Sequence, residues 1–200
     1  MTDVLTCPRC GPEFGLVLLA DRVEERRILD GWLGCPNCRE RYRVRNGHAD
    51  LVFGQPAGQA GEASEAEATR LAALLGVTEG PGMLLLVGSG AANAGRIADM
   101  VADVEVVAAA GALNEEAERA GVCRVAVGAM LPFRSRSMKG VALTDAASIE
   151  LLAEAVRVTG AHARVVAQSG RPDVAAQLEQ NGLRVLARDE STTVAERGVF

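Results

Sequence analysis

Four cysteines near the start of the chain have the type and spacing needed to hold a metal ion. They form two Cys-x-x-Cys turns, Cys7-Pro-Arg-Cys10 and Cys35-Pro-Asn-Cys38. One such turn brings two sulfurs close enough to share an ion, and the second completes a tetrahedron of thiolates. Structural zinc sites take four ligands of this kind, whereas a catalytic zinc site keeps one position for water. The spacing therefore predicts a structural zinc site, with the ligands Cys7, Cys10, Cys35 and Cys38.

Two disulfides, or an iron or iron–sulfur centre, are the alternative uses of these cysteines. The chain opens Met1-Thr-Asp-Val-Leu-Thr, without the basic start and apolar stretch of a secretory signal. We therefore expect a cytoplasmic protein, in which the thiols stay reduced and available to a metal. The metal would supply much of the folding free energy of so small a domain.

The charge balance argues against a nucleic-acid surface spread over the molecule. The 200 residues include 21 Lys and Arg against 26 Asp and Glu, so RNA binding would need a local basic patch. Arginines do gather around the cysteines, but acidic residues are interleaved with them, and we expect a solvated, self-paired surface. These arginines are Arg9, Arg22, Arg26, Arg27, Arg39, Arg41, Arg43 and Arg45. No apolar run reaches membrane-spanning length, so we expect no membrane insertion.

The chain divides by composition into three segments. Residues 1–53 hold the cysteines and have alternating runs that suit strands at 16–20, 26–30 and 40–45. Residues 54–65 are rich in Gly, Pro and Ala, which is typical of a linker. From 66 to 200, helical and strand patterns alternate. Helices are expected over 66–76, 92–102, 114–120, 147–159 and 172–181, and strands over 83–87, 104–108, 123–127, 140–143, 163–168, 183–187 and 192–196.

This alternation predicts a three-layer α/β fold with a mostly parallel sheet and an antiparallel finish, preceded by a small β-rich zinc-binding domain. Gly88-Ser89-Gly90 follows the first buried strand, where backbone N–H groups at a helix start can approach a nucleotide-like cofactor. The same glycines could serve only a tight strand-to-helix turn. The third glycine of the dinucleotide-binding pattern is absent, since Asn93 stands at its position.

Both parts of the chain carry motifs of known families. The cysteine turns, with residues 30–51 from Asp30-Gly-Trp to Asp50-Leu, resemble the small zinc-ribbon proteins that activate tRNA, rRNA and translation-factor methyltransferases. His48-Ala49 stands where that family usually has Ile-Pro. Residues 66–198 resemble class I S-adenosylmethionine-dependent methyltransferases. The resemblance lies in residues 84–90 (Leu-Leu-Leu-Val-Gly-Ser-Gly) and 127–133 (Val-Gly-Ala-Met-Leu-Pro-Phe), and it implies the Rossmann-like fold of that family.

The second resemblance lacks the acidic residues with which that family holds its cofactor. Such acids usually stand two residues before the first glycine, at the end of the second strand, and before the Leu-Pro-Phe element. Here the positions hold Leu86, Ala109 or Ala110, and Gly128. Ala92 replaces the third glycine, and Met138-Lys139 replaces the Phe-Asp that usually opens the fourth strand. Because the ribose acid accepts two hydrogen bonds, losing every acid together is expected to remove useful affinity.

The sequence thus predicts a methyltransferase-like pseudoenzyme with no catalytic residue. We expect zinc as the cofactor, and we consider binding of S-adenosylmethionine doubtful. Gly88, Ser89 and Gly90 are interpreted as the remnant of a cofactor site. The expected role is a binding, scaffolding or regulatory subunit, whose partner is an active methyltransferase, a larger assembly or a second copy. The alternatives are an active methyltransferase with an atypical pocket and a zinc-ribbon RNA-binding protein.

Overall fold

The computed structural model describes residues 2–113, 118–144 and 148–198. The elements in chain order are η1 (Thr2–Val4), β1 (Thr6–Cys7), β2 (Gly11–Gly15), β3 (Val17–Glu24), β4 (Arg27–Gly34), β5 (Arg41–Arg45), β6 (His48–Leu51), α1 (Glu65–Leu75), β7 (Glu79–Val87), η2 (Gly88–Asn93), α2 (Ala94–Met100), β8 (Ala102–Ala110), β9 (Val122–Val127), β10 (Met138–Leu143), α3 (Ile149–Val158), β11 (Thr159–Gln168), α4 (Val174–Gln180), β12 (Leu183–Arg188) and β13 (Thr192–Arg197). None of the helices in these ranges is long and apolar enough to span a bilayer.

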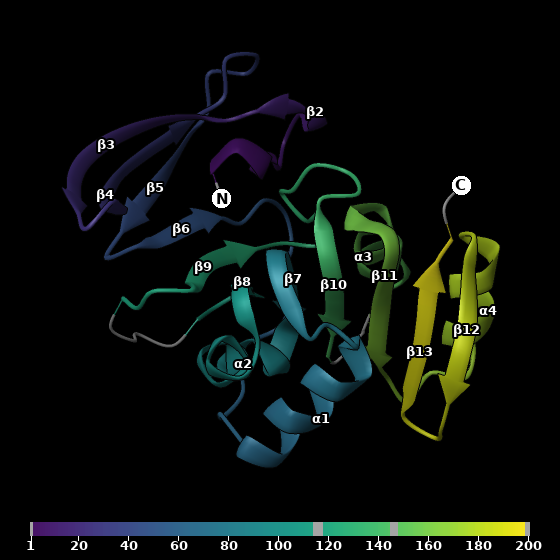
Figure 1. The fold of residues 1–200 in the computed structure, drawn as a ribbon. Helices are drawn as coiled ribbons and strands as arrows, with labels where there is room; N and C mark the ends of the chain where they lie inside the picture. The colour runs from purple at the N-terminus through teal and green to yellow at the C-terminus, as the bar shows by residue number, and fades with distance from the viewer. Residues whose placement is uncertain (1, 114–117, 145–147, 199–200) are drawn as a thin grey trace.

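Eleven strands form one sheet in the order β12-β13-β11-β10-β7-β8-β9-β6-β5-β4-β3 (Figure 1). Neighbouring strands from β11 to β6 pair in parallel. At one end, β13 pairs antiparallel with β11, and β12 pairs antiparallel with β13. At the other end, β5, β4 and β3 continue the sheet from β6 in antiparallel pairs. The prediction of a mostly parallel α/β sheet with an antiparallel finish is therefore confirmed.

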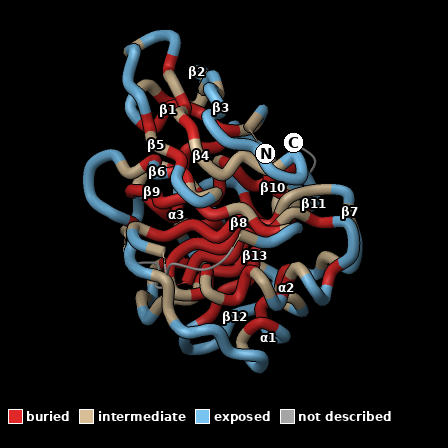
Figure 2. The backbone as a smooth tube through the Cα atoms, turned by 90° about the vertical axis from the view of Figure 1, so that its left-hand side faces the viewer, coloured by how far each residue is buried: buried red, intermediate tan, exposed pale blue. Residues whose placement is uncertain are grey.

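The sheet has a separate apolar core on each face, because successive strand residues point to opposite sides. In β7, Leu84 and Leu86 pack on the side of α1 and α2, whereas Leu85 and Val87 pack on the side of α3 and α4. Figure 2 shows how the buried residues concentrate in the central strands. Parallel strands that are covered on both faces consist of continuous runs of apolar residues, which explains the apolar run at 83–87.

The cysteine-bearing unit, residues 2–51, is joined to the α/β unit by strand pairing. β6 lies parallel to β9, with His48 opposite Arg124 and Leu51 opposite Val127. The strands expected at 16–20, 26–30 and 40–45 correspond to β3, β4 and β5, whereas β6 was not predicted. This short strand makes the N-terminal unit a continuation of the same sheet, so the unit packs on its own chain.

A second contact joins the two units through the Leu131-Pro-Phe133 element. Thr6 donates its backbone N–H to the carbonyl of Pro132, and Arg134 donates to Val4. Leu5 and Phe133 face each other as an isolated antiparallel bridge, and both side chains are buried. The N-terminal unit therefore shares one apolar core with α3, α4 and this face of the sheet.

Local signals set the helix ends. Ser64 caps α1 by accepting from the N–H of Glu67, and Gly76 ends it in the left-handed conformation. The helix expected over 92–102 begins instead as the 3-10 turn η2 and becomes α2 only from Ala94 to Met100. Of the helix expected over 114–120, residues 114–117 lie outside the described residues, and 118–120 are not helical.

Candidate functional site

The fold brings the four cysteines of the two turns together. Their sulfur atoms all lie within 4.8 Å of one another. The Sγ of Cys7 lies 3.7 Å from that of Cys38, and the Sγ of Cys35 lies 3.8 Å from that of Cys10. Four sulfurs at about 2.3 Å from one tetrahedral zinc ion would stand about 3.8 Å apart. The observed separations fit this geometry and are far longer than a disulfide bond of about 2.05 Å.

Groups around this cysteine cluster are oriented toward sulfur. The backbone N–H of Cys10 donates to the Sγ of Cys7 at 3.4 Å, and the amide of Asn37 donates to Cys10 at 3.4 Å. The hydroxyl of Tyr42 lies 3.4 Å from the Sγ of Cys7. Burial disfavours the thiolate of Cys7, but these hydrogen bonds outweigh it and lower the pKa of the thiol from 9.0 to about 7. This shift toward the thiolate form that a metal requires belongs to Cys7, whereas burial raises the pKa of the Cys35 thiol.

The segment 54–61, called the strap below, lies across the carboxyl ends of β9, β8 and β7. The N–H of Ala57 donates to Val127 at the end of β9, and Ala129 donates back to Gln55. Further along, Gly111 donates to Gly58 and Ala60 donates to Ala112, both just beyond β8. Gly61 finally donates to the carbonyl of Ser89 after β7. Part of the predicted linker is thus held against the sheet by backbone hydrogen bonds.

Small residues at the ends of β8 and β9 make room for the strap. A Cβ on Gly111 would lie 2.4 Å from the Cβ of Pro56, and one on Gly128 would lie 2.4 Å from the carbonyl oxygen of Phe53. Leu86 and Ala109, two other positions at which the resemblance noted in the sequence implies acids, are fully buried in the apolar cores. The missing acids are therefore replaced by packing within the chain itself.

The glycine turn after β7 also has internal partners. Gly88 has a φ of +85°, which a residue without a Cβ adopts at little cost. The N–H of Gly90 donates to the hydroxyl of Thr144 at 2.6 Å, and this hydroxyl donates to the carbonyl of Val87 at 2.8 Å. A Cβ on Gly90 would lie 2.7 Å from the Cγ2 of Thr144. The turn is thus closed by a side chain that follows β10.

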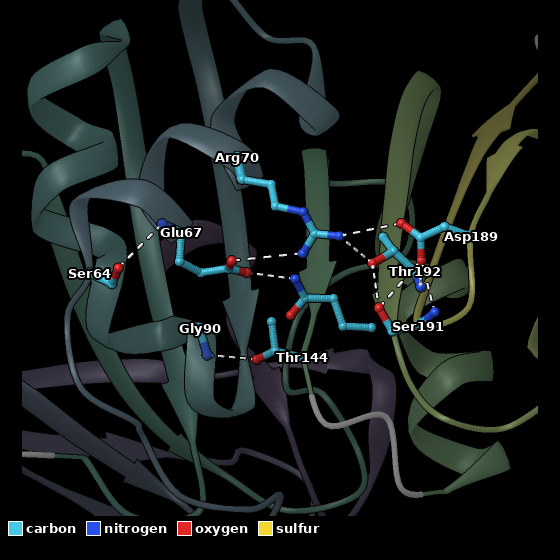
Figure 3. A network of polar contacts seen from close by, with 9 residues as sticks. Ser64, Glu67, Arg70, Gly90, Thr144, Asp189, Ser191 and Thr192 are labelled. Atoms are coloured by element: carbon cyan, nitrogen blue, oxygen red, sulfur yellow. Dashed lines mark hydrogen bonds and ion pairs between the residues drawn. The ribbon is translucent and has the colours of Figure 1, made fainter.

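A polar cavity of about 760 Å³ opens beside this turn, between α1, η2 and the ends of β10 and β11. Figure 3 shows Glu67 and Arg70 of α1 pointing toward each other, and Arg70 in contact with Thr192 and Asp189. The described residues that line the cavity are Gly61, Glu62, Glu67, Arg70, Ser89, Gly90, Asn93, Thr144, Gln168, Ser169, Gly170, Arg171 and Ser191. Of these, only Ser89 and Gly90 belong to the cofactor-site remnant that the sequence predicts.

Two further groups of residues have structural surroundings. Four of the arginines near the cysteines form ion pairs: Arg9 with Glu40, Arg22 with Glu24 and Asp30, Arg27 with Glu118, and Arg43 with Asp21. The thiol of Cys123 donates to Glu105 at 2.7 Å, and burial and this carboxylate raise its pKa. A thiol in this state is a poor nucleophile.

No family model matches the sequence, and no curated protein matches it significantly. Solved structures do match. One is a chain from the complex of the Haloferax volcanii Trm112 methyltransferase activator with a methyltransferase, at 15% identity and a TM-score of 0.52, covering 66% of this chain and 88% of that one. Another is the Burkholderia thailandensis 1,6-didemethyltoxoflavin-N1-methyltransferase, solved with S-adenosylhomocysteine, at 12% identity and a TM-score of 0.50, covering 67% and 77%.

The fold is that of the class I methyltransferases. At these identities the likeness establishes the fold alone, since one fold can serve many functions. It gives no reason by itself to doubt S-adenosylmethionine. Any argument about the cofactor has to come from the residues at the carboxyl edge of this sheet.

Proposed function

We propose that this protein is a non-catalytic member of the methyltransferase fold, stabilised by a structural zinc ion and acting as a binding, scaffolding or regulatory subunit. In this proposal residues 1–53 form a zinc-ribbon domain that resembles the methyltransferase activators, 54–65 connect it, and 66–200 form the methyltransferase-like domain. Zinc is bound by Cys7, Cys10, Cys35 and Cys38, and contributes to folding rather than to chemistry.

The observation that carries this proposal is the position of the strap. In open α/β sheets, ligands bind in the crevice outside the carboxyl ends of the strands. At β8 and β9 this place is taken by residues 55–60, with hydrogen bonds to Val127, Gly111 and Ala112. A nucleoside bound there would have to displace these contacts.

The residues beneath the strap support the same conclusion. Carboxylates that accept hydrogen bonds from a ligand contribute about 1.5–3 kcal/mol each. Leu86, Ala110 and Gly128 offer no such acceptor side chain, so the affinity for an adenosyl group should be weaker by at least about a thousandfold. The Gly90 N–H is also already bonded to Thr144.

The zinc domain has a role in assembly within this proposal. Its resemblance to activators that bind separate methyltransferases suggests that the corresponding contact is here made inside one chain, through β6 and β9. A partner would then meet the joined unit as one surface. Affinity purification from the native organism should recover a methyltransferase or a larger assembly, and recovery of the protein alone would argue against these two partners.

The decisive test is calorimetric titration of the purified protein with S-adenosylmethionine. We expect that S-adenosylmethionine does not bind with a Kd below about 1 mM, the value that corresponds to a binding free energy of only about −4 kcal/mol. A Kd in the low micromolar range would overturn the proposal and favour the active methyltransferase. As a matched variant, Pro56→Gly combined with Ala57→Gly loosens the strap without changing the sheet. Binding by this variant alone would assign the loss of affinity to the strap instead of the missing acids.

The RNA-binding alternative needs a separate measurement. With Arg9, Arg22, Arg27 and Arg43 ion-paired, we expect little RNA affinity. Filter binding at 50 and 200 mM salt would reveal it, because phosphate contacts weaken steeply with salt. A strong, salt-sensitive affinity would replace the scaffold proposal by the RNA-binding one.

A further inference from the structure

Strands β3, β4 and β5 present one face of the large sheet to the surface. Leu19 of β3 lies opposite Trp32 of β4, which lies opposite Arg43 of β5. Residues that oppose each other in antiparallel strands point to the same side, and so do residues two positions apart on one strand. The side chains that share this side, called the open face below, are Val17, Leu19, Trp32, Arg41, Arg43 and Arg45.

The open face continues the side of the sheet that α1 and α2 cover. Arg45 lies opposite His48 of β6, and His48 lies beside Arg124 of β9. Arg124 in turn lies beside Ala108 of β8, which belongs to the core under α1 and α2. The described helices pack mainly on β8 to β13, and Figure 1 shows β3, β4 and β5 extending beyond them. Because a sheet is stabilised by a further layer on its apolar face, a helix on the open face would continue the existing layer.

The centre of the open face is apolar and aromatic. Val17 and Leu19 are 56% and 51% exposed. Trp32 lies next to Leu19, and the guanidinium carbon of Arg43 stands 4.6 Å from the centre of its ring. Adjacent exposed apolar groups mark contact surfaces, and Trp and Arg carry much of the binding energy at protein interfaces. This centre fits the apolar stripe of an amphipathic helix.

The charges beside this centre indicate what flanks the apolar stripe of the partner. Arg41 and Arg45 are exposed, and neither has a carboxylate partner in the part of the chain that the structure describes. Arg43, between them, is already paired with Asp21 at 3.5 Å. Guanidinium groups pair with carboxylates, so Asp or Glu beside the stripe would complement the face. RNA is less suitable, because the ring of Trp32 is already in contact with Arg43 and is not free to stack on bases.

We propose that the open face binds an acidic amphipathic helix of a partner protein. Its apolar side chains would cover Val17, Leu19 and Trp32, and its carboxylates would pair with Arg41 and Arg45. This inference rests on the proposed function, since it names the kind of partner that such a binding subunit takes.

The test uses a labelled helical peptide of about 18 residues, or five turns, with leucines along one stripe and glutamates on both sides of it. A matched peptide has lysines in place of the glutamates. By fluorescence anisotropy with the full chain, the glutamate peptide should bind with a Kd below about 100 μM, and at least tenfold more tightly than the lysine peptide. Binding of neither peptide, or equal binding of both, would overturn the inference.

The fluorescence of the protein itself reports where the peptide lies. Trp32 is the one tryptophan of the sequence. With an unlabelled glutamate peptide, its emission should shift to shorter wavelength, because the helix would remove the ring from water. Binding without any change in this emission would place the peptide elsewhere and contradict the proposal.

Variants separate the apolar from the charged part of the face. Leu19→Ser should weaken binding of the glutamate peptide at least tenfold. Arg41→Glu combined with Arg45→Glu should do the same and should now favour the lysine peptide. Leu186→Ser is the matched control, an exposed leucine of β12 at the far end of the sheet, and should bind as the wild type does. Wild-type affinity in both open-face variants would refute the assignment. If Leu19→Ser fails to fold, the charge-reversed variant still decides.

Two further outcomes are distinguishable. A uridine oligomer of about twelve nucleotides that displaces the glutamate peptide would make the open face a nucleic-acid site and overturn the inference. The proposed function fails separately, through low-micromolar affinity for S-adenosylmethionine, which no peptide measurement affects.

Discussion

The cysteine cluster and the strap-covered edge of the sheet differ in what completes them. At the cluster, four sulfurs converge within 4.8 Å, and a backbone N–H and an amide point at them. Four thiolates this close would repel one another, so the proposed zinc ion would complete the cluster. At the edge, glycine and alanine receive the chain's own backbone, and the hydrogen bonds are already made. The first region offers a full set of ligand atoms to a metal, and the second is closed by the protein's own backbone.

The comparison teaches that resemblance to a family is informative only together with the surroundings of its motif residues. Both regions carry family motifs. The cysteines keep the complete donor set for a tetrahedral metal, whereas Gly88 and Gly90 keep the turn without the acids and with Thr144 bound to it. Changes at the cysteines, at Glu118, at Gly128 and at His48 test this difference.

Removing the metal should have the largest effect. Because structural zinc contributes about 10–16 kcal/mol of apparent binding free energy, Cys35→Ser or a chelator should unfold the N-terminal unit. Metal analysis and far-ultraviolet circular dichroism would measure the loss of about one zinc per chain and of strand signal. Cys123→Ser is the matched control, a cysteine outside the cluster, and should keep its zinc. Metal-free wild-type protein with unchanged structure would contradict the prediction.

Glu118→Gln should cost about 3–5 kcal/mol, the usual loss when one partner of a buried pair is removed. Glu118 bridges Arg27 of β4 at 2.6 Å and Arg124 of β9 at 3.1 Å, and the Arg124 side chain is only 8% exposed. This change tests whether the stability of the N-terminal unit depends on its contact with β9 as well as on metal. Urea denaturation would measure the change in the free energy of unfolding. Glu40→Gln, in an exposed pair with Arg9, should cost at most about 0.5 kcal/mol, and equal costs would refute the argument.

Gly128→Val should destabilise the protein by about 1–3 kcal/mol, since added atoms must displace packed neighbours. The first of these atoms would lie 2.4 Å from the carbonyl oxygen of Phe53. Limited proteolysis should then cut within 54–61 faster than in the wild type. Gly198→Ala, with nothing within 4 Å of the added Cβ, is the control. An unchanged cleavage rate in Gly128→Val would show that the strap is not held by this contact.

The smallest effect concerns acid pH. Burial, and next the charge of Arg124, lower the pKa of His48 below 6.5, so the folded state favours the neutral ring. The unfolded state then binds more protons, and stability present above pH 6.5 is lost as the pH falls toward the folded pKa. His48→Gln should reduce the fall in Tm between pH 7.5 and 5.5 by about 2 °C. His162→Gln, at the exposed histidine, should leave the fall unchanged, and a similar change in both variants would contradict this assignment.

The order of helices and strands could be predicted because it depends on local pattern. The helix predicted at 66–76 matches α1 closely, and the apolar run at 83–87 corresponds to the second half of β7, which begins at Glu79. β6 escaped prediction because four residues, His48 to Leu51, carry too little alternation. It becomes a strand because it pairs with β5 on one side and with the edge of β9 on the other.

The candidate sites also combine features that local sequence predicts with features that depend on tertiary contacts. The proposed metal ligands could be predicted from local sequence, since the two-residue spacing inside each turn indicates which sulfurs can share an ion. The lack of acids at Leu86 and Gly128 could also be read from the sequence. What occupies their place could not, because the strap meets β9, β8 and β7 across distant parts of the chain. The pairing of Glu67 and Arg70 with Gln168 and Thr192 likewise depends on α1 lying against β11 and β13, which no local pattern encodes.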